Sequence, residues 1–436
     1  MERRTRYALL FICIAMLNFT ASCTYSKDAG DSELTQTHIQ EKKIKLRFIS
    51  SWGGVDSKAD TLRQILDEFG EDYTEAEVIN ESMFGEDFLP KIKTDFASGN
   101  EQDVFGLWPG SDIRSLVKAG KVADITDLLE SEREWKGSFE ESNWSYTTYE
   151  GRTYGVPLEI IYEGFFVNKD LFEKYGVKLP ETYDELKAAV AEFKVHDIIP
   201  IAYNTLAEGT YLYQNIIAML GGKEAVENPY SRGTINSCYI EAVDYVKELY
   251  QLGAFPKDAF TMTSRDRNNL FKNKKAAMIT QGSWFVGDLK DMQSSVDIIP
   301  FPRLEKNGAG RDVLIYGLGN GTFYMSRKAW EDPAKKELSI KLLKKLTSQE
   351  SALAFVNQCG MISNVKLPED KMNYSKLAMK GLELIKSSRE MIGPPDSFVD
   401  RTVWEEYIAK RFPYVLEGRE TAQTLWDEAV KRTRNF

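Results

Sequence analysis

Aromatic, carboxylate and amide side chains stand directly after most of the predicted strands of this chain. Aromatic rings offer a large, flat contact area at small entropic cost, and carboxylates and amides bind hydroxyl groups through directional hydrogen bonds. In α/β proteins, ligands bind beyond the carboxyl ends of strands. The candidate ligand-binding residues are therefore Trp52, Asp56, Glu81, Trp108, Glu159, Tyr162, Asn204, Glu208, Tyr211, Ser283, Trp284, Tyr316 and Trp404.

Alternating strand and helix patterns carry these residues. Ile44, Leu46 and Phe48 alternate as in a strand, and residues 62–69 then repeat apolar side chains at helical spacing. A second short strand follows at 78–79. Strand, helix and strand in this order indicate a parallel α/β sheet.

The stretch from Glu150 to Phe193 contains a predicted crossing between domains, around which the rest of the chain is expected to be arranged. Pro157 breaks regular strand pairing, so a change of direction or a crossing between domains is expected there. The apolar run 160–167 predicts a buried strand, and Gly176 is expected to end the short helix after it. A capping box formed by Thr182 and Glu185 starts the next helix.

Several motifs of this chain resemble those of one protein family. Gly151 opens G-R-T-Y-G-V-P, and Val167 opens V-N-K-D-L-F-E-K-Y-G-V-K-L-P-E-T-Y-D-E-L. The chain also carries A-S-G-N-E-Q-D-V-F at 97–105, L-V-K-A-G-K-V-A-D-I at 116–125 and F-K-N-K-K-A-A-M at 271–278. In this order they resemble the extracellular solute-binding proteins of ABC transporters, family 1, the carbohydrate-binding, maltose-binding-protein-like group. The departures from the family pattern are Gln102, which replaces a proline, and Asn273–Lys274, which replaces a glycine.

The resemblance implies a two-lobed α/β fold of the periplasmic-binding-protein type II. Each lobe would be a mainly parallel sheet flanked by helices, and a hinge would join the two lobes. The first lobe is expected at 44–156 and 300–350, and the second at 157–299 and 351–436. A chain of 436 residues is long enough for two or three domains.

The resemblance also implies function: capture of a sugar between the lobes by hinge closure, and delivery to the permease subunits of an ABC transporter. The many candidate aromatics favour an oligosaccharide over a monosaccharide. A monomer that is not an enzyme is expected. Two alternatives stay open: a secreted carbohydrate-active enzyme, which also needs tryptophans and paired carboxylates, or a binding protein that serves a sensor kinase or takes a non-sugar ligand.

Composition narrows the classes of partner. The formal net charge is −10 and the lysines are spread along the chain, which argues against a nucleic-acid surface. Only two histidines occur, His38 and His196, and no cysteine pair has metal-ligand spacing. Gly317, Gly319 and Gly321 lack the spacing of a nucleotide loop. No cofactor and no metal ion are therefore expected.

The first residues have the pattern of a targeting segment. Arg3, Arg4 and Arg6 precede an apolar run at 7–19 that is too short to span a membrane comfortably. Residues 1–22 are expected to be a lipoprotein signal peptide, and 23–43 a flexible polar tether. The sequence T-A-S-C resembles a lipobox with Cys23 as the lipidated residue, although Thr20 stands where leucine is usual.

The predicted location is therefore the outer face of a bacterial plasma membrane, with the lipid as anchor. Ordinary signal cleavage or an uncleaved anchor remain as alternatives. Cys238 and Cys359 could form a disulfide in an oxidising envelope. Two thiols so far apart in sequence are more often separate buried residues, which we expect here.

Overall fold

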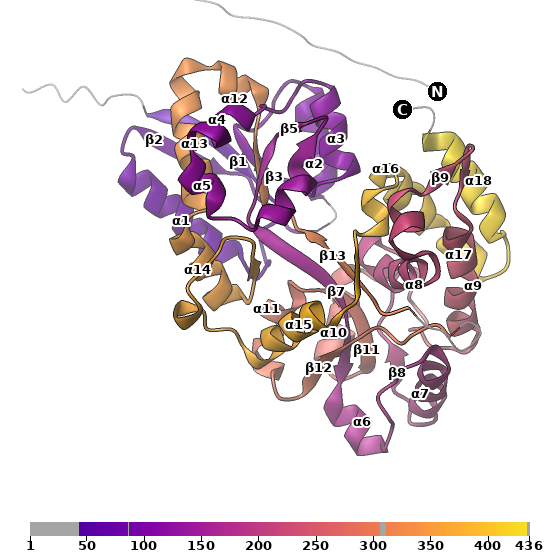
Figure 1. The fold of residues 1–436 in the computed structure, drawn as a ribbon. Helices are drawn as coiled ribbons and strands as arrows, with labels where there is room; N and C mark the ends of the chain where they lie inside the picture. The colour runs from indigo at the N-terminus through magenta and orange to yellow at the C-terminus, as the bar shows by residue number, and fades with distance from the viewer. Residues whose placement is uncertain (1–42, 86, 306–310, 434–436) are drawn as a thin grey trace, which may run out of the picture. The chain divides into compact units, whose positions relative to one another are not determined.

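The computed structural model describes residues 43–85, 87–305 and 311–433. The expected signal peptide, with Cys13, and nearly all of the expected tether, with Cys23 and His38, lie outside the described residues. Two sheets organise the described part of the chain (Figure 1).

The first sheet has five strands. Their order across the sheet is β2 (Ala76–Asn80), β1 (Ile44–Ile49), β3 (Val104–Gly106), β14 (Thr322–Met325) and β6 (Gly155–Pro157). β1 pairs in parallel with β2 and β3, whereas β14 runs antiparallel to β3 and β6. The strand–helix–strand pattern at the start of the chain thus gives a parallel sheet, as predicted.

The second sheet has seven strands and is mixed. Its main path runs β16 (Glu390–Ile392), β13 (Val313–Leu318), β7 (Glu159–Asn168), β11 (Ala276–Gly282) and β8 (Ile199–Ile201). Two further strands, β12 (Val296–Ile299) and β15 (Ile362–Ser363), also pair with β7. Because β7 runs antiparallel to β11, β12, β13 and β15, this sheet is not mainly parallel, which corrects the sequence expectation.

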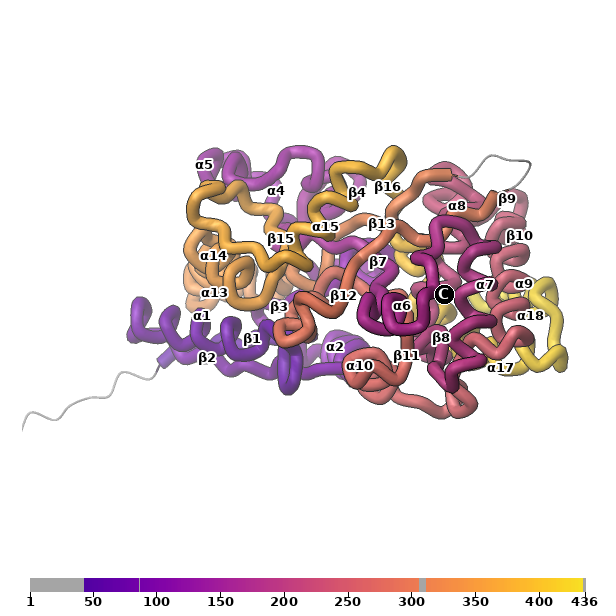
Figure 2. The backbone as a smooth tube through the Cα atoms, turned by 90° about the horizontal axis from the view of Figure 1, so that it is seen from below, coloured from indigo at the N-terminus to yellow at the C-terminus, as the bar shows by residue number. Residues whose placement is uncertain are grey.

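β7 is the long central strand, and all ten of its residues are buried. It follows β6 of the first sheet after a single residue, Leu158. Figures 1 and 2 both show β7 between the elements around β1 and the elements around β8. The predicted crossing near Pro157 therefore coincides with the step from one sheet to the other.

Helices flank both sheets. Those that follow strands of the first sheet, or pack with them, are α1 (Ala59–Asp72), α2 (Phe88–Ala97), α3 (Ser111–Lys118), α4 (Thr126–Ser131), α5 (Arg133–Gly137), α12 (Arg327–Glu331), α13 (Pro333–Leu346) and α14 (Gln349–Cys359). The others are α6 (Lys169–Tyr175), α7 (Tyr183–Val195), α8 (Tyr211–Glu227), α9 (Ser237–Gln251), α10 (Ser264–Lys272), α11 (Phe285–Asp288), α15 (Lys376–Ser387), α16 (Arg401–Val403), α17 (Lys410–Leu416) and α18 (Ala422–Thr433). A π-helical segment, η6 (Trp404–Ala409), joins α16 to α17.

Short elements complete the fold. Two hairpins pair β4 (Thr148–Tyr149) with β5 (Arg152–Thr153), and β9 (Tyr230–Ser231) with β10 (Thr234–Ile235). The 3-10 turns are η1 (Glu141–Thr147), η2 (Ala207–Thr210), η3 (Lys290–Met292), η4 (Glu369–Lys371) and η5 (Pro395–Ser397).

Local sequence signals explain where the helices begin and end. The Thr182 hydroxyl accepts a hydrogen bond from the Glu185 amide, and the Glu185 carboxylate accepts one from the Thr182 amide, so the predicted capping box is confirmed. Gly176 ends α6 with a φ of 65°, a left-handed conformation that glycine adopts without steric cost.

The segment boundaries differ in two places from the expected lobes. β13 pairs with β7 of the second sheet, although 300–350 was expected with the first lobe. α14 packs in the same apolar core as Trp52 and Phe48, although 351–436 was expected with the second lobe. After β12 the chain first adds β13 to the second sheet beside β7. It then returns to the first sheet with β14.

Candidate functional site

Tyr211 and Trp284 form the aromatic part of the candidate site. Tyr211 is the first residue of α8, and Trp284 follows β11 at the start of α11. Their ring centroids lie 5.9 Å apart with an interplanar angle of 72°, and both side chains are partly exposed. A Cβ atom on Gly282 would come within 2.1 Å of the Trp284 ring, so the ring occupies space that only a glycine leaves.

Glu208 supplies an acceptor beside this aromatic pair. Arg267 Nη2 lies 3.1 Å from Glu208 Oε2, and Gln281 Nε2 donates to the same oxygen at 2.8 Å. Gln281 comes from β11 and Arg267 from α10, so two separate elements hold the carboxylate in place. Such a fixed acceptor can bind a ligand hydroxyl without first losing side-chain freedom.

Glu163 is a second carboxyl group near Tyr211, and β7 buries it. Asn215 Nδ2 donates a hydrogen bond to Glu163 Oε2 at 2.9 Å. Burial, followed by the negative charge of Asp396, raises the pKa of Glu163 well above its ordinary value. A carboxyl group in such surroundings keeps its proton more readily and can donate a hydrogen bond as well as accept one.

A charged group joins the two halves of the fold at Arg401. Its guanidinium Nε lies 2.7 Å from Asp112 Oδ2, and Nη1 lies 3.1 Å from Asp396 Oδ2 and 3.4 Å from Glu405 Oε1. The guanidinium carbon also lies 5.1 Å from the centre of the Trp108 ring. Trp108, Asp112, Asp396, Arg401 and Glu405 are called the Arg401 cluster below.

The Arg401 cluster connects elements that pack in different cores. Trp108 and Ile113, next to Asp112, belong to the core behind β3, whereas Val403 and Trp404 pack in the core around α8. Lys93 of α2 strengthens the connection, with Nζ at 3.2 Å from Asp112 Oδ1 and a 2.8 Å hydrogen bond to Thr402. The cluster is therefore a contact between the first and second halves of the fold.

Three polar atoms of this contact are buried without a hydrogen-bond partner among the described residues. They are Ser111 Oγ, Asp396 Oδ1 and Arg401 Nε, whose ion pair with Asp112 lacks the geometry of a hydrogen bond. Asp396 is 5% exposed and Arg401 is 9% exposed. Buried polar atoms are costly when unpaired, so Ser111 Oγ and Asp396 Oδ1 are the atoms of this contact that can still take a hydrogen bond from water or a ligand.

Electrostatic coupling links the Arg401 cluster to Tyr211. Burial raises the pKa of the Tyr211 hydroxyl well above its ordinary value. Glu208, Glu163 and Asp396 raise this pKa further, and Arg401 opposes them. Tyr211 thus lies within the electrostatic reach of both the Glu208 network and the Arg401 cluster.

Four of the residues predicted from sequence belong to this arrangement: Trp108, Glu208, Tyr211 and Trp284. Ser283 adjoins it, is buried, and donates its backbone amide to the Tyr162 carbonyl at 2.9 Å. Together these residues and the Arg401 cluster combine aromatic faces with fixed carboxylates, which is the combination that a hydroxyl-rich ligand needs.

The structure places three predicted aromatic residues in apolar cores instead. Trp52 is 2% exposed and packs against Phe323 and Phe355, at 5.6 and 4.9 Å between ring centroids. Trp404 is fully buried and donates Nε1 to Thr210 Oγ1 at 3.0 Å. Tyr162 is 1% exposed, so all three have packing partners rather than an open face.

Predicted carboxylates outside the arrangement have structural partners. Glu81 forms two hydrogen bonds with Arg47, at 2.5 and 2.9 Å. Glu159 forms a buried ion pair with Lys58 at 3.2 Å and accepts from the Gly321 amide at 3.1 Å. The glycine-rich bend is required here, because a Cβ atom on Gly319 would come within 2.1 Å of Glu159 Oε2.

The last three predicted residues also have local roles. Asp56 accepts the Lys58 amide at 2.8 Å just before α1. Asn204 is buried and donates to the Met262 carbonyl at 3.2 Å. Tyr316 accepts a 3.3 Å hydrogen bond from Asn143, so its hydroxyl points to η1.

Glu163, Asp112, Asp396 and Arg401 were not among the residues predicted from the sequence. Glu163 adjoins the predicted Tyr162, and one charged residue inside the apolar run 160–167 was a usable signal. Asp396 and Arg401 follow Pro394–Pro395, a turn signal that the prediction did not use. Asp112 gives no such signal, since an acidic residue in the first turn of a helix is common.

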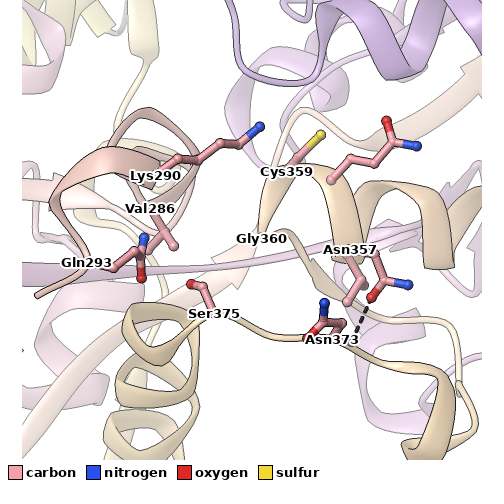
Figure 3. Close-up of a pocket in the computed structure, with 11 residues that line it drawn as sticks. Val286, Lys290, Gln293, Asn357, Cys359, Gly360, Asn373 and Ser375 are labelled. Atoms are coloured by element: carbon pink, nitrogen blue, oxygen red, sulfur yellow. Dashed lines mark hydrogen bonds between the residues drawn. The ribbon is translucent and has the colours of Figure 1, made fainter.

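A separate pocket of about 280 Å³ lies between the end of α14 and the α11–η3 segment (Figure 3). Its lining includes Lys290, Gln293, Cys359 and Ser375 but none of the predicted ligand residues. Most of its polar groups already have protein partners. Gln293 accepts from the Leu377 amide, and the hydroxyl of Ser375 caps α15.

Cys238 and Cys359 are both buried and free, which confirms that they do not pair. Within the described ranges, no group of three or more histidine, cysteine, aspartate or glutamate residues could hold a metal ion. No helix in the described part of the chain is both long and apolar enough to cross a bilayer.

Comparison with known proteins defines the class. Residues 56–353 match the model of the bacterial extracellular solute-binding protein family, and the chain belongs to this family. It is 25% identical over 323 residues to the multiple sugar-binding protein of Streptococcus mutans, and the matched region covers 71% of each chain. It is 24% identical over 362 residues to the maltodextrin-binding protein MdxE of Bacillus subtilis, and the matched region covers 81% of each chain.

A solved structure supports the fold. A chitin oligosaccharide binding protein superposes with a TM-score of 0.79 at 20% identity, over 90% of this chain and 98% of the other. The two-lobed α/β fold of the periplasmic-binding-protein type II, predicted from the sequence motifs, is thereby confirmed.

Proposed function

We propose that this protein captures a sugar or oligosaccharide between its two lobes and delivers it to the permease subunits of an ABC transporter. The observation that carries the proposal is the Tyr211–Trp284 pair beside the fixed carboxylate of Glu208. Sugar rings stack on aromatic faces through their C–H groups, while their hydroxyls bind carboxylates and amides. The names of the sugar-binding and maltodextrin-binding relatives agree with this ligand class.

Closure of the lobes completes the site in this proposal. The Arg401 cluster brings Trp108 and Asp112 of one half to Arg401 and Asp396 of the other. A ligand that contacts both halves favours the closed state by its differential affinity for that state. Binding and release need no change of covalent bonds, so the proposed activity is capture without catalysis.

The chain is proposed to act as a monomer at the outer face of the plasma membrane, held by a lipid on Cys23. The support is the signal-like segment before Cys23 and the family of extracellular proteins to which the chain belongs. Metabolic labelling with a fatty-acid probe tests the anchor. Label on the wild type and none on Cys23→Ser is expected, whereas equal label on both would contradict it.

A thermal-shift screen of the full chain in detergent tests the ligand class. A ligand that binds only the folded state raises the melting temperature by mass action. We expect a clear shift with one class of neutral mono- or oligosaccharide, lost in Trp284→Ala and retained in Trp330→Phe. Trp330 is the matched control, because it lies on α12 beneath Lys336 and packs against the apolar core that contains Trp52.

The same screen separates the alternatives. Conversion of the bound sugar, detected by chromatography, would favour a carbohydrate-active enzyme. No shift with any carbohydrate would overturn the sugar proposal, and peptides and other polar solutes would then be screened. Sugar binding without uptake through any permease in the native cell would favour service to a sensor kinase.

A further inference from the structure

The positive charges of the Arg401 cluster are already neutralised by carboxylates. Asp112, Asp396 and Glu405 all lie within 3.4 Å of the Arg401 guanidinium. Lys93 adds a second positive charge, but its ammonium group lies 3.2 Å from the same Asp112. Three carboxylates thus face two cations at this contact.

The neighbouring Glu208 network is also internally paired. Arg267, the cation closest to Glu208 in this network, lies 3.1 Å from its carboxylate. Glu208, Glu163 and Asp396 each raise the pKa of the Tyr211 hydroxyl, and Arg401 lowers it. Burial raises the pKa of Glu405, Arg401 and Lys93 oppose this shift, and Asp112 and Asp396 add to it.

The unpartnered atoms specify what the site can accept. Asp396 Oδ1 is a buried acceptor that lacks a donor among the described residues. A ligand hydroxyl can donate to it, whereas a ligand carboxylate or phosphate brings only acceptors and a like charge. The Trp108 ring, held by Arg401 on one side, gives the same ligand an apolar face.

We propose that the site is selective for uncharged saccharide units and rejects acidic ones, with Asp396, Asp112 and Glu405 as the residues that determine this selectivity. The inference rests on the proposed function and narrows its ligand class. Repulsion by like charges in a desolvated contact reduces affinity strongly, so we expect an acidic analogue to bind at least about tenfold more weakly than its neutral parent.

Calorimetric titration of the full chain in detergent tests the selectivity. The probes are neutral trisaccharides of glucose, xylose and N-acetylglucosamine, then the glucose trisaccharide and its analogue with one terminal unit oxidised to a uronate. Tighter binding of the neutral form supports the inference. Equal or tighter binding of the uronate overturns it and leaves sugar capture standing, whereas no binding of any probe overturns both.

Variants identify the residues responsible. Glu405→Gln and Asp396→Asn each replace a carboxylate of the cluster with a neutral amide. Each variant should therefore reduce the difference in affinity between the neutral trisaccharide and its uronate analogue. Glu406→Gln is the matched control: Glu406 is the next residue of η6, is more than half exposed and pairs with Lys410. The assignment would be contradicted if this difference in affinity stayed the same in both cluster variants, or if it changed equally in Glu406→Gln.

Discussion

At the residue scale, buried ionisable groups decide how this protein responds to pH and to substitution. Glu163 and Lys58 differ in whether an oppositely charged group lies beside the buried side chain. Glu163 has an amide partner but no cation at hydrogen-bond distance among the described residues, whereas Lys58 has the carboxylate of Glu159 at 3.2 Å. A buried carboxyl group without a cation favours its neutral form, and a buried ion pair favours both charged forms.

Glu163→Gln should stabilise the protein at neutral pH. The folded-state pKa of Glu163 is raised above 4.5, so the folded wild type binds more protons than the unfolded chain above that pH. The contribution of Glu163 to wild-type stability therefore falls as pH rises from about 4.5 through the raised pKa, by at most about 1.4 kcal/mol per pH unit. The glutamine carbonyl can still accept from Asn215 and has no proton to lose.

Chemical denaturation at a series of pH values measures this effect. The difference in unfolding free energy between Glu163→Gln and wild type should grow with pH above about 4.5. A constant difference across that range would show that the Glu163 carboxyl is not perturbed by folding.

Lys58→Met should destabilise the protein by about 3–5 kcal/mol, because it leaves the Glu159 charge buried without its partner. Both side chains are almost fully buried, at 2% and 4% exposure. The double variant Lys58→Met/Glu159→Leu should lose less than the single variant, since no unpaired charge remains. Denaturant unfolding of both variants tests this, and a double variant less stable than Lys58→Met would contradict it.

At the element scale, α3 and α16 meet through Asp112 and Arg401, and this contact bears on lobe closure. Asp112→Asn should weaken the contact, because Arg401 loses one of its carboxylates and Lys93 loses its ion-pair partner. Loss of one member of a buried charge pair typically costs about 2–5 kcal/mol. Without ligand, the variant should therefore populate more open conformations.

Small-angle scattering of the ligand-free full chain in detergent measures the shift as an increased radius of gyration. Asp127→Asn is the control, since that side chain is 90% exposed and its nearest cation, Arg152, is 3.8 Å away. Equal radii for wild type and Asp112→Asn would show that this contact does not influence closure.

The elements themselves were largely predictable from sequence. Thr182, Glu185 and Gly176 mark helix ends by local chemistry that depends on few neighbours. The mixed second sheet was not predictable, because strand direction depends on distant pairing: β7 lies beside β11 and β13, which follow more than a hundred residues later.

The site was only partly predictable for a related reason. Trp284 and Trp52 both follow a strand, but Trp284 lies beside Tyr211 and Trp52 lies in the core beneath Gly321. Nothing local distinguishes the two positions. Arg401 lies more than 280 residues from Asp112, so their pairing became visible only in three dimensions.

At the scale of the whole molecule, the family and the fold both bear on the proposed closure of the lobes. Membership in the extracellular solute-binding protein family and the two-lobed fold agree with a site between the lobes. The aromatic pair comes from the half around β11, while Trp108 comes from the half around β3. A ligand held by both should draw the lobes together.

The most direct test of sugar capture by closure is small-angle scattering of the full chain, in detergent, with and without the saccharide that gives the largest thermal shift. We expect a smaller radius of gyration with the sugar, and no change when the same sugar is added to Trp284→Ala. A sugar that binds the wild type without reducing its radius, or the absence of any sugar that binds, would contradict it.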